Sequence, residues 1–167
     1  EQVGVEVEAE VTIAEGMKLR GRIDRLEKTV DGDYHIVDFK SGTNCPSKKA
    51  IADHVQLLTY QLILHHGAFD GTKIRTARST ESGMTVDGAT LVYPEKETKN
   101  IWSITQAAKT EEQLTEFENQ LPDLLQTLRG PELQAQRNPR CVTCKLKPIC
   151  PVFDTGKWTT EPTTNVS

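Results

Sequence analysis

The sequence predicts an α/β (α+β) domain in which helices flank a mixed β-sheet. Residues 3–13 and 17–40 alternate between apolar and polar side chains, as strands with one buried face do. Two later stretches, 48–66 and 111–128, carry apolar residues at helical spacing. Strands followed by a helix, further strands and a second helix are typical of this class. A Cys-rich loop at 141–150 follows the second helix.

Size and charge limit the possible functions. The 167 residues suit one domain with its own core, which we place at residues 1–153, before a flexible Thr- and Pro-rich tail at 154–167. The net charge of −4 argues against binding nucleic acid through bulk charge alone. An apolar run of about 18 residues, as a membrane helix needs, and a signal peptide are both missing, so we expect a cytoplasmic protein without a membrane partner. Because the chain starts within a strand pattern and without Met, we interpret it as a fragment of a longer protein.

The first strand and a β-hairpin open the chain. Val, Ala and Ile alternate with Glu, Gly and Thr over 3–13, which indicates a half-buried strand. The hairpin has predicted strands at 17–29 and 34–40, and Asp31-Gly32-Asp33 supplies the residues of a tight turn.

The hairpin register decides which polar side chains meet. If the hairpin is symmetric about Gly32, Asp24 lies opposite Lys40 and Leu26 lies opposite Asp38. Paired residues share a face, and so do residues two apart in a strand. Asp24, Asp38 and Lys40 then project from one face, unless a bulge breaks the alternation.

The remaining elements follow from caps and spacing. Ser47 is the predicted cap of a helix over 48–66, which Gly67 ends. Thr110 is the predicted cap of the helix over 111–128, and Pro122 predicts a kink or break within it. The apolar stripe of the first helix is predicted at Ile51, Val55, Leu58 and Leu62. Three shorter strands are predicted at 73–79, 89–94 and 100–105.

The hairpin cluster indicates a metal site. Two carboxylates on one face repel each other unless a cation lies between them, and Mg²⁺ commonly takes one or two protein carboxylates. Lys40 beside them would hold or deprotonate an attacking water, or offset charge in the transition state. Asp24, Asp38 and Lys40 therefore suit metal-assisted phosphodiester hydrolysis. The alternative is a solvated face with a cross-strand ion pair. Glu97-Thr98-Lys99 has the same spacing as Asp38 and Lys40 but no apolar residues before it.

Gln56 and Tyr60 lie one turn apart in the predicted helix over 48–66. At this spacing they share a face, where they would contact a phosphate backbone or order the catalytic residues. The alternative is the polar edge of an ordinary amphipathic helix.

Together these stretches resemble a known family. GRIDR around Asp24, VDFKSG with Asp38 and Lys40, and QLLTY in the following helix resemble the three motifs of the PD-(D/E)xK nuclease superfamily. The resemblance is strongest to the RecB-type nuclease domains of UvrD-like helicases, covers about residues 5–150 and implies a restriction-endonuclease-like fold. It implies that Asp24, Asp38 and the Phe39 carbonyl bind metal and that Lys40 is the catalytic lysine. The third-motif pair would be Gln56 and Tyr60.

Two features of the family match less well. Glu8 corresponds only loosely to an acidic metal ligand of the preceding strand. The family's upstream metal-binding histidine has no counterpart, since each histidine of this chain stands in the wrong order. We therefore expect packing or surface roles for His35, His54, His65 and His66.

The Cys-rich loop holds Cys141, Cys144 and Cys150. Three thiols this close favour a metal or cluster over disulfides in a chain without secretory features. The spacing resembles the iron–sulfur staple of AddB-type nuclease domains, which implies a [4Fe–4S] cluster with a fourth, upstream cysteine. Cys45 is not upstream of the first strand, so we favour a fourth ligand that precedes this chain over Cys45 itself. The alternatives are a zinc site with Cys45, a disulfide, or reduced unligated thiols.

The resemblance implies a Mg²⁺- or Mn²⁺-dependent deoxyribonuclease that cuts single strands, as an exo- or endonuclease, during DNA-end processing and recombinational repair. Its implied partners are DNA, the helicase domain of the same parent chain and a second helicase–nuclease subunit. One alternative is a stand-alone, CRISPR-associated RecB-like exonuclease. The other is an inactive iron–sulfur scaffold or DNA-binding module, against which the intact Asp24, Asp38 and Lys40 argue.

Overall fold

The computed structural model describes residues 1–96, 101–129 and 135–153. Contacts divide the chain into two compact units, residues 1–120 and 121–167. The single domain over 1–153 stays a prediction. The predicted tail, 154–167, lies outside the described residues, and so does Glu97-Thr98-Lys99.

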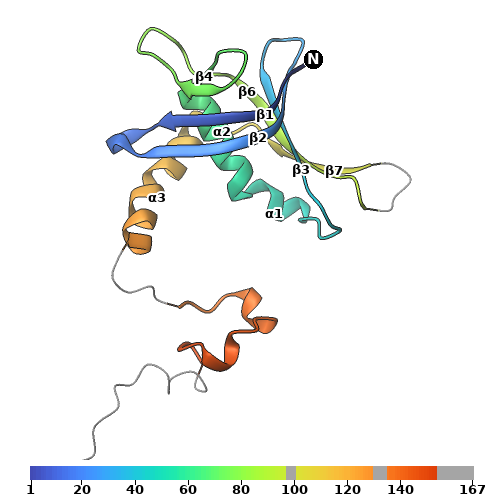
Figure 1. The fold of residues 1–167 in the computed structure, drawn as a ribbon, viewed down its shortest axis with the longest axis vertical. Helices are drawn as coiled ribbons and strands as arrows, with labels where there is room; N and C mark the ends of the chain where they lie inside the picture. The colour runs from blue at the N-terminus through green and yellow to red at the C-terminus, as the bar shows by residue number, and fades with distance from the viewer. Residues whose placement is uncertain (97–100, 130–134, 154–167) are drawn as a thin grey trace, which may run out of the picture. The chain divides into compact units, whose positions relative to one another are not determined.

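Seven strands of the described residues form one mixed sheet in the first unit, in the order β4-β5-β1-β2-β3-β6-β7 (Figure 1). They are β1 (Gln2–Thr12), β2 (Lys18–Lys28), β3 (Tyr34–Phe39), β4 (Gly67–Phe69), β5 (Ile74–Thr76), β6 (Val86–Tyr93) and β7 (Trp102–Ala107). The β1–β5 and β3–β6 pairs are parallel, and the other pairs are antiparallel. The predicted α/β class with a mixed sheet is therefore confirmed.

Strand bounds differ from the prediction after the hairpin. Gly67 ends the preceding helix as expected, but it also begins β4, which the sequence did not predict. The strand predicted at 73–79 is shorter, β6 begins before residue 89, and β7 runs two residues further than 105.

The helices are α1 (Lys48–Ala52), α2 (Val55–His66) and α3 (Glu111–Arg129), with the 3₁₀ turns η1 (Ala14–Gly16), η2 (Pro139–Val142) and η3 (Lys147–Ile149). The prediction of one helix over 48–66 is wrong, because the chain breaks between α1 and α2. Ser47 does cap α1, where its Oγ accepts a hydrogen bond from the Ala50 N–H at 3.2 Å. None of the described helices is long and apolar enough to cross a membrane.

The break between α1 and α2 is held by a buried amide from β7. The Gln106 Nε2 atom donates to the carbonyls of Ile51 at 2.9 Å, Ala52 at 3.2 Å and His54 at 3.3 Å. The Oε1 atom of Gln106 accepts from Gln61 Nε2 of α2 at 2.9 Å. These bonds add to the backbone hydrogen bonds that the Ile51 and His54 carbonyls already accept, and they tie the break to β7. The break also changes which residues of the predicted stripe are covered: Ile51 and Leu62 are buried, but Val55 is exposed.

The α3 helix begins as predicted. The Thr110 Oγ1 atom accepts from the Gln113 N–H at 3.3 Å, and Gln113 Oε1 accepts from the Thr110 N–H at 3.1 Å, which forms a reciprocal cap. The helix continues through Pro122, so the expected break does not occur there.

The hairpin turn is centred on Asp31 and not on Gly32. The Thr29 N–H donates to the Asp33 carbonyl at 2.8 Å, and the Gly32 N–H donates to the Thr29 carbonyl at 3.2 Å. Gly32 has φ 95°, a left-handed conformation that favours glycine at the end of a three-residue hairpin loop.

This turn shifts the register of β2 and β3 by two residues. Leu26 pairs with Ile36 and Arg25 pairs with Val37, whereas the sequence predicted Leu26 opposite Asp38. A shift of two preserves the alternation of faces, and the next residues along the two strands are Asp24 and Asp38. The predicted pairs of residues across the hairpin were therefore wrong. A shift of two residues still leaves Asp24 and Asp38 on the same face of the sheet.

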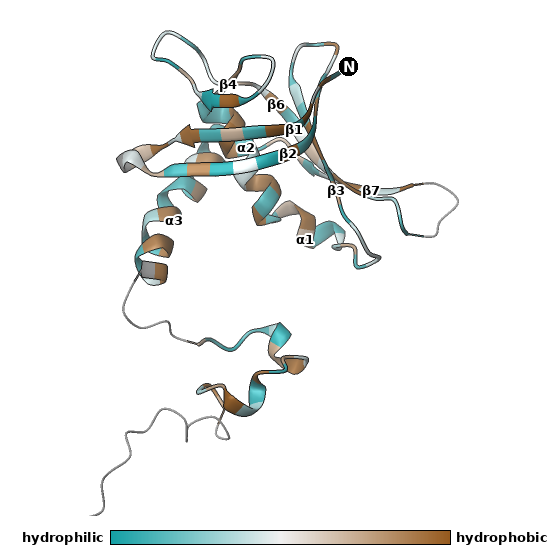
Figure 2. Cartoon of the chain, in the orientation of Figure 1, coloured by the Kyte–Doolittle hydropathy of each residue, from teal (hydrophilic) through white to brown (hydrophobic). Residues whose placement is uncertain are grey.

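One face of the sheet packs against α2, and apolar residues alternate with polar ones along β1 (Figure 2). Val7 and Ile23 pair across β1 and β2 and are both buried. The alternation changes phase just beyond them: Ile23 and Leu26 are both buried although three residues apart, and Glu6 of β1 has φ 52°. Such local irregularity re-aims side chains in a strand, and Asp24 lies within it.

Candidate active site

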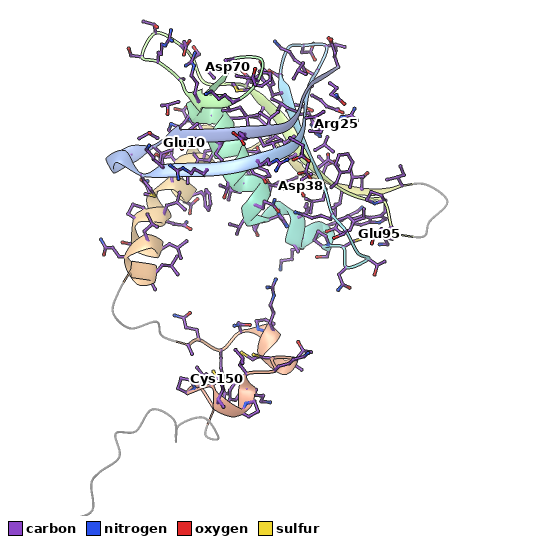
Figure 3. The ribbon with its side chains drawn as sticks, viewed as in Figure 1. Glu10, Arg25, Asp38, Asp70, Glu95 and Cys150 are labelled. Atoms are coloured by element: carbon purple, nitrogen blue, oxygen red, sulfur yellow. The ribbon has the colours of Figure 1, made fainter. Side chains whose placement is uncertain are left out.

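Asp38 is the buried centre of the cluster, near the end of β3 and between the sheet and α2 (Figure 3). It is 2% exposed, its Oδ1 accepts from Gln56 Nε2 at 2.9 Å, and its Oδ2 is 2.7 Å from Lys40 Nζ. Apart from this ion pair, the buried Oδ2 makes no hydrogen bond within the described residues. Burial raises the pKa of the Asp38 carboxyl, and Asp24 adds to the increase, whereas Lys40 opposes it.

Asp24 lies beside Asp38 on the neighbouring strand. Its Oδ2 accepts a hydrogen bond from the Phe39 N–H at 2.7 Å, and its charge contributes to the raised pKa of Asp38. The phase change in β2 explains how a residue next to buried Ile23 brings its carboxylate to this point. Two carboxylates therefore meet at the end of β3, as the sequence predicted.

Lys40 and Gln56 fix each other. The Lys40 Nζ donates to Gln56 Oε1 at 2.6 Å, and the Lys40 backbone N–H donates to the Val92 carbonyl of β6 at 2.8 Å. Because the Gln56 amide donates to Asp38 with its nitrogen and accepts from Lys40 with its oxygen, its orientation is determined by both partners.

Tyr60 anchors this network to the sheet. Its hydroxyl accepts from Gln56 Nε2 at 3.0 Å and donates to the Arg22 carbonyl of β2 at 2.8 Å. Gly21, next to Arg22, leaves room for the ring, since a Cβ there would lie 2.9 Å from the ring of Tyr60. The face shared by Gln56 and Tyr60 thus orders the charged residues of the hairpin.

Replacing Tyr60 by phenylalanine is expected to remove the anchor of Gln56 while keeping the packed ring. We expect a loss of about 1–2 kcal/mol in the free energy of unfolding, because the hydroxyl's partners lose a bond, and a fall of about 10-fold in the rate of the reaction at this site. Urea unfolding and single-turnover rates check this. The matched change Tyr34→Phe, at a half-buried ring of β3, is expected to alter neither.

His54 belongs to the surroundings of this site, which sequence reasoning did not predict. It precedes α2, its Nδ1 is buried without a hydrogen bond within the described residues, and it interacts electrostatically with Asp38 and Lys40. Burial lowers the pKa of the His54 imidazole, Lys40 lowers it further, and Asp38 opposes them. The break after α1 is what brings this histidine here, and the sequence carries little local sign of that break. His35 and His66 form hydrogen bonds with Thr90 and Glu118, respectively.

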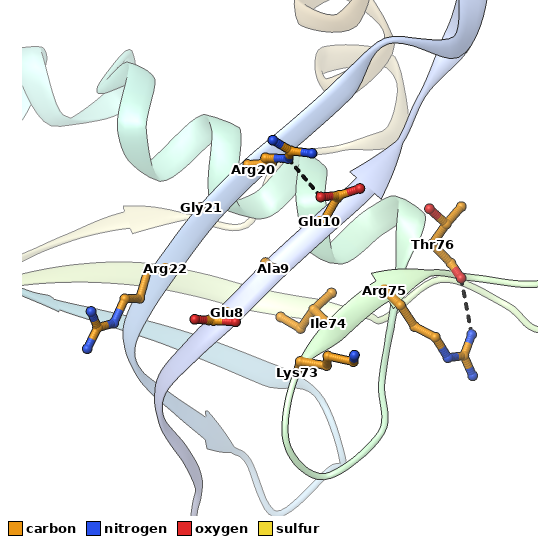
Figure 4. Close-up of a pocket in the computed structure, with 10 residues that line it drawn as sticks. All are labelled: Glu8, Ala9, Glu10, Arg20, Gly21, Arg22, Lys73, Ile74, Arg75 and Thr76. Carbon is orange, nitrogen blue, oxygen red and sulfur yellow. Dashed lines mark hydrogen bonds and ion pairs between the residues drawn. The ribbon is translucent and has the colours of Figure 1, made fainter.

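Glu8 is not brought to the cluster. Its neighbours Val7 and Ala9 are buried toward α2, so the alternation of β1 places Glu8 on the opposite face. There it lines a groove with charged residues of β1, β2 and β5, and Figure 4 shows it among them. These residues include Arg20, Arg22 and Arg75.

The donor set of the cluster fits Mg²⁺. Among the described residues no group of three or more His, Cys, Asp or Glu side chains is arranged to hold a metal ion. The carboxylates that the structure brings together at the end of β3 are those of Asp24 and Asp38. Mg²⁺ commonly takes one or two carboxylates and keeps waters in its remaining positions. The Asp38 Oδ2, which is buried and paired with Lys40, is the kind of oxygen that such a cation would use. The Phe39 carbonyl as a further ligand stays a prediction.

The Cys-rich loop of the second unit gives no support to a cluster. Cys141, Cys144 and Cys150 are free thiols, and the structure does not gather them into a metal-binding group within the described residues. The Cys141 Sγ instead accepts a hydrogen bond from the Asn138 N–H at 3.3 Å. The [4Fe–4S] site therefore stays a prediction, and so does any role of Cys45.

A family model described as the PD-(D/E)XK nuclease superfamily matches residues 1–151. No curated protein matches the chain. Among solved structures, the crystal structure of SSO0001 is similar, with 17% sequence identity and a TM-score of 0.39. The match covers 89% of this chain and 60% of that one, so the chain spans less than two thirds of its length.

Proposed function

The chain belongs to the PD-(D/E)XK nuclease superfamily, and we propose that it hydrolyses phosphodiester bonds of DNA with the help of Mg²⁺ or Mn²⁺. The observation that carries the proposal is the network of Asp24, Asp38, Lys40 and Gln56. It combines two carboxylates with a lysine whose Nζ lies 2.7 Å from the Asp38 Oδ2 and 2.6 Å from the Gln56 Oε1. An isolated surface ion pair would need neither the buried aspartate nor the amide.

The chemistry follows from these positions. Asp24 and Asp38, with the Phe39 carbonyl, would hold the metal ion, which when bound supplies positive charge to a phosphate oxygen. Lys40 adds a second positive charge where negative charge develops, or takes a proton from the attacking water. Water adds to phosphorus, one bond from phosphorus to a sugar oxygen breaks, and that oxygen leaves with a proton. Gln56 and Tyr60 hold the lysine in place.

The finer parts of the proposal concern substrate and setting. We propose single-stranded DNA as the substrate, cut in exo- or endonucleolytic mode. We also propose that a helicase domain of a longer parent chain, with a second helicase–nuclease subunit, holds most of the DNA. The net charge of −4 supports this division of labour, because the chain itself provides little bulk attraction for the DNA backbone.

The test is cleavage of end-labelled single-stranded DNA in Mg²⁺, in Mn²⁺ and in EDTA, by the protein and by its Asp24→Asn variant. We expect cleavage only with a divalent metal and at least a 100-fold lower rate for the variant. Asparagine can still accept the hydrogen bond from the Phe39 N–H, so the change removes charge with little effect on the fold.

The control is Asp31→Asn, an equivalent change in the exposed hairpin turn, which should cleave normally. The proposal would be abandoned if the protein cleaved no DNA in either metal. Equal cleavage by the Asp24→Asn variant would also contradict it, because the activity would then reside elsewhere.

A further inference from the structure

A row of side chains crosses the sheet beside the candidate active site. The register pairs Asp38 of β3 with Leu91 of β6, and two residues later Tyr93 of β6 pairs with Trp102 of β7. Residues two apart in a strand share a face, and so do directly paired residues. Lys40, Tyr93 and Trp102 therefore lie side by side on the face that carries Asp38.

The distance from this row to the catalytic residues is short. Adjacent strands are separated by about 4.8 Å, so β7 places Trp102 about 10 Å from β3 and Lys40. The Lys40 N–H donates to the Val92 carbonyl at 2.8 Å, which fixes β6 at this level. The pKa of Tyr93 is raised by burial, and the charges of Asp38 and Lys40 also act on it, in agreement with this placement.

The aromatic side chains are arranged as a platform. Tyr93 is buried and meets Trp102 edge-on, with ring centroids 5.2 Å apart and planes at 77°. Trp102 is only half-buried, and Lys96 Nζ lies over its ring at 4.2 Å from the centroid. The buried Tyr93 ring holds the indole of Trp102 in place. Lys96 covers one face of that indole and can move away from it to bind an anion.

We propose that Trp102, held by Tyr93, stacks an unpaired base of the substrate strand, and that Lys96 then contacts a phosphate of that strand. This inference rests on the proposed nuclease function and adds a position for the strand. Stacking of bases on aromatic side chains is the usual way to hold single strands without reading their sequence.

Charge favours a stacking contact at this point. One neighbouring acidic group is Glu95, whose Oε2 accepts from the Gly42 N–H at 2.8 Å and so ties the loop after β3 to the end of β6. A carboxylate here opposes capture of phosphates by charge alone, and the chain is acidic as a whole. A stacked base supplies affinity that does not depend on counterions. A base within a duplex is stacked on its neighbours, so the platform selects an unpaired one.

The experiment measures binding separately from cleavage. Single-stranded oligonucleotides carrying a fluorescent end label are titrated in Ca²⁺ in place of Mg²⁺, with wild type, Trp102→Ala, Trp102→Phe and Lys96→Ala. We expect about 10-fold weaker binding for Trp102→Ala and near-normal binding for Trp102→Phe. For Lys96→Ala we expect the slope of log affinity against log salt to fall by about one. Ile101→Ala, at an exposed neighbour of the tryptophan, is the matched control and should bind normally.

A series of oligonucleotides, each with one abasic position, locates the stacked base. Wild type should bind about 10-fold less tightly when one particular base is missing, and Trp102→Ala should be insensitive to that position. Equal sensitivity of both proteins at every position would overturn the inference, as would normal binding by Trp102→Ala. Urea unfolding of each variant excludes a lost fold as the cause. If wild type binds in this pattern but never cleaves in Mg²⁺, the proposed function fails and the stacking site stands.

Discussion

Replacing Asp38 by asparagine is expected to lower the rate of Mg²⁺-dependent DNA cleavage by about 1,000-fold, which corresponds to about 4 kcal/mol of transition-state stabilisation. Asparagine keeps an oxygen that can accept from Gln56 Nε2, so the position of α2 should be preserved. The change removes the charge that would hold the metal and that pairs with Lys40 at 2.7 Å. Single-turnover cleavage of labelled DNA measures the effect.

The same variant separates metal binding from folding. Mg²⁺ is expected to raise the unfolding temperature of wild type as its concentration increases, because it binds the native state, and to leave Asp38→Asn unaffected. Asp87→Asn, at a largely exposed position of β6, is the matched control and should behave as wild type. Normal metal stabilisation of Asp38→Asn would show that this carboxylate is not a metal ligand.

The raised pKa of Asp38 gives the metal affinity a defined pH dependence. Metal needs the ionised carboxylate, so the affinity for Mg²⁺ should increase as the pH rises through the raised pKa. In the metal-free protein, the free energy of unfolding changes in the opposite direction as the pH rises. The stability that Asp38 contributes is present below its ordinary pKa and is lost as the pH rises through the raised pKa. Titrations with Mg²⁺ at several pH values should show this increase in affinity for wild type and not for Asp38→Asn.

Replacing Gln106 by methionine is expected to lower the free energy of unfolding by about 2–5 kcal/mol. Methionine has a similar volume, so the effect is polar: the carbonyls of Ile51 and Ala52 and the Gln61 amide each lose one of their hydrogen bonds. We also expect slower cleavage, since His54, at the start of α2, is bonded through its carbonyl to the same amide. Urea unfolding measures the first effect and single-turnover cleavage the second.

Gln120→Met is the control, because this glutamine is exposed on α3 and its loss should change stability by less than about 0.5 kcal/mol. If both variants were equally stable, the buried amide would not be what holds the break between α1 and α2.

Much of the candidate site could be predicted from the sequence because its signals are local. Alternation in the hairpin put Asp24 and Asp38 on neighbouring strands, and the spacing of Gln56 and Tyr60 put both on one face of a helix. The exact pairs were wrong because Gly32 adopts a left-handed conformation at the end of the loop, which moves the centre of the turn by one residue.

What could not be predicted depends on residues far apart in the chain. The break before α2 is stabilised by Gln106, which is separated from Ile51 by 55 positions, and nothing near residue 53 reports it. The approach of His54 to Asp38 follows from that break. No local sequence pattern pointed to Trp102 either. Its place beside Tyr93 follows from the pairing of β6 with β7, and the place of Tyr93 near Lys40 follows from the parallel pairing of β3 with β6.

The hydrogen bonds from Gln106 to the break between α1 and α2 have a consequence for partial unfolding of the protein. The site residues all come from one hairpin and the helix after it, a short stretch that can form its contacts with little loop-closure entropy. Their alignment, however, relies on β7, an edge strand bonded to the sheet on one side only. Partial unfolding that detaches β7 would therefore loosen α2 and abolish catalysis while the β2–β3 hairpin stays paired. Catalytic competence would then fail at a lower free energy than the fold as a whole.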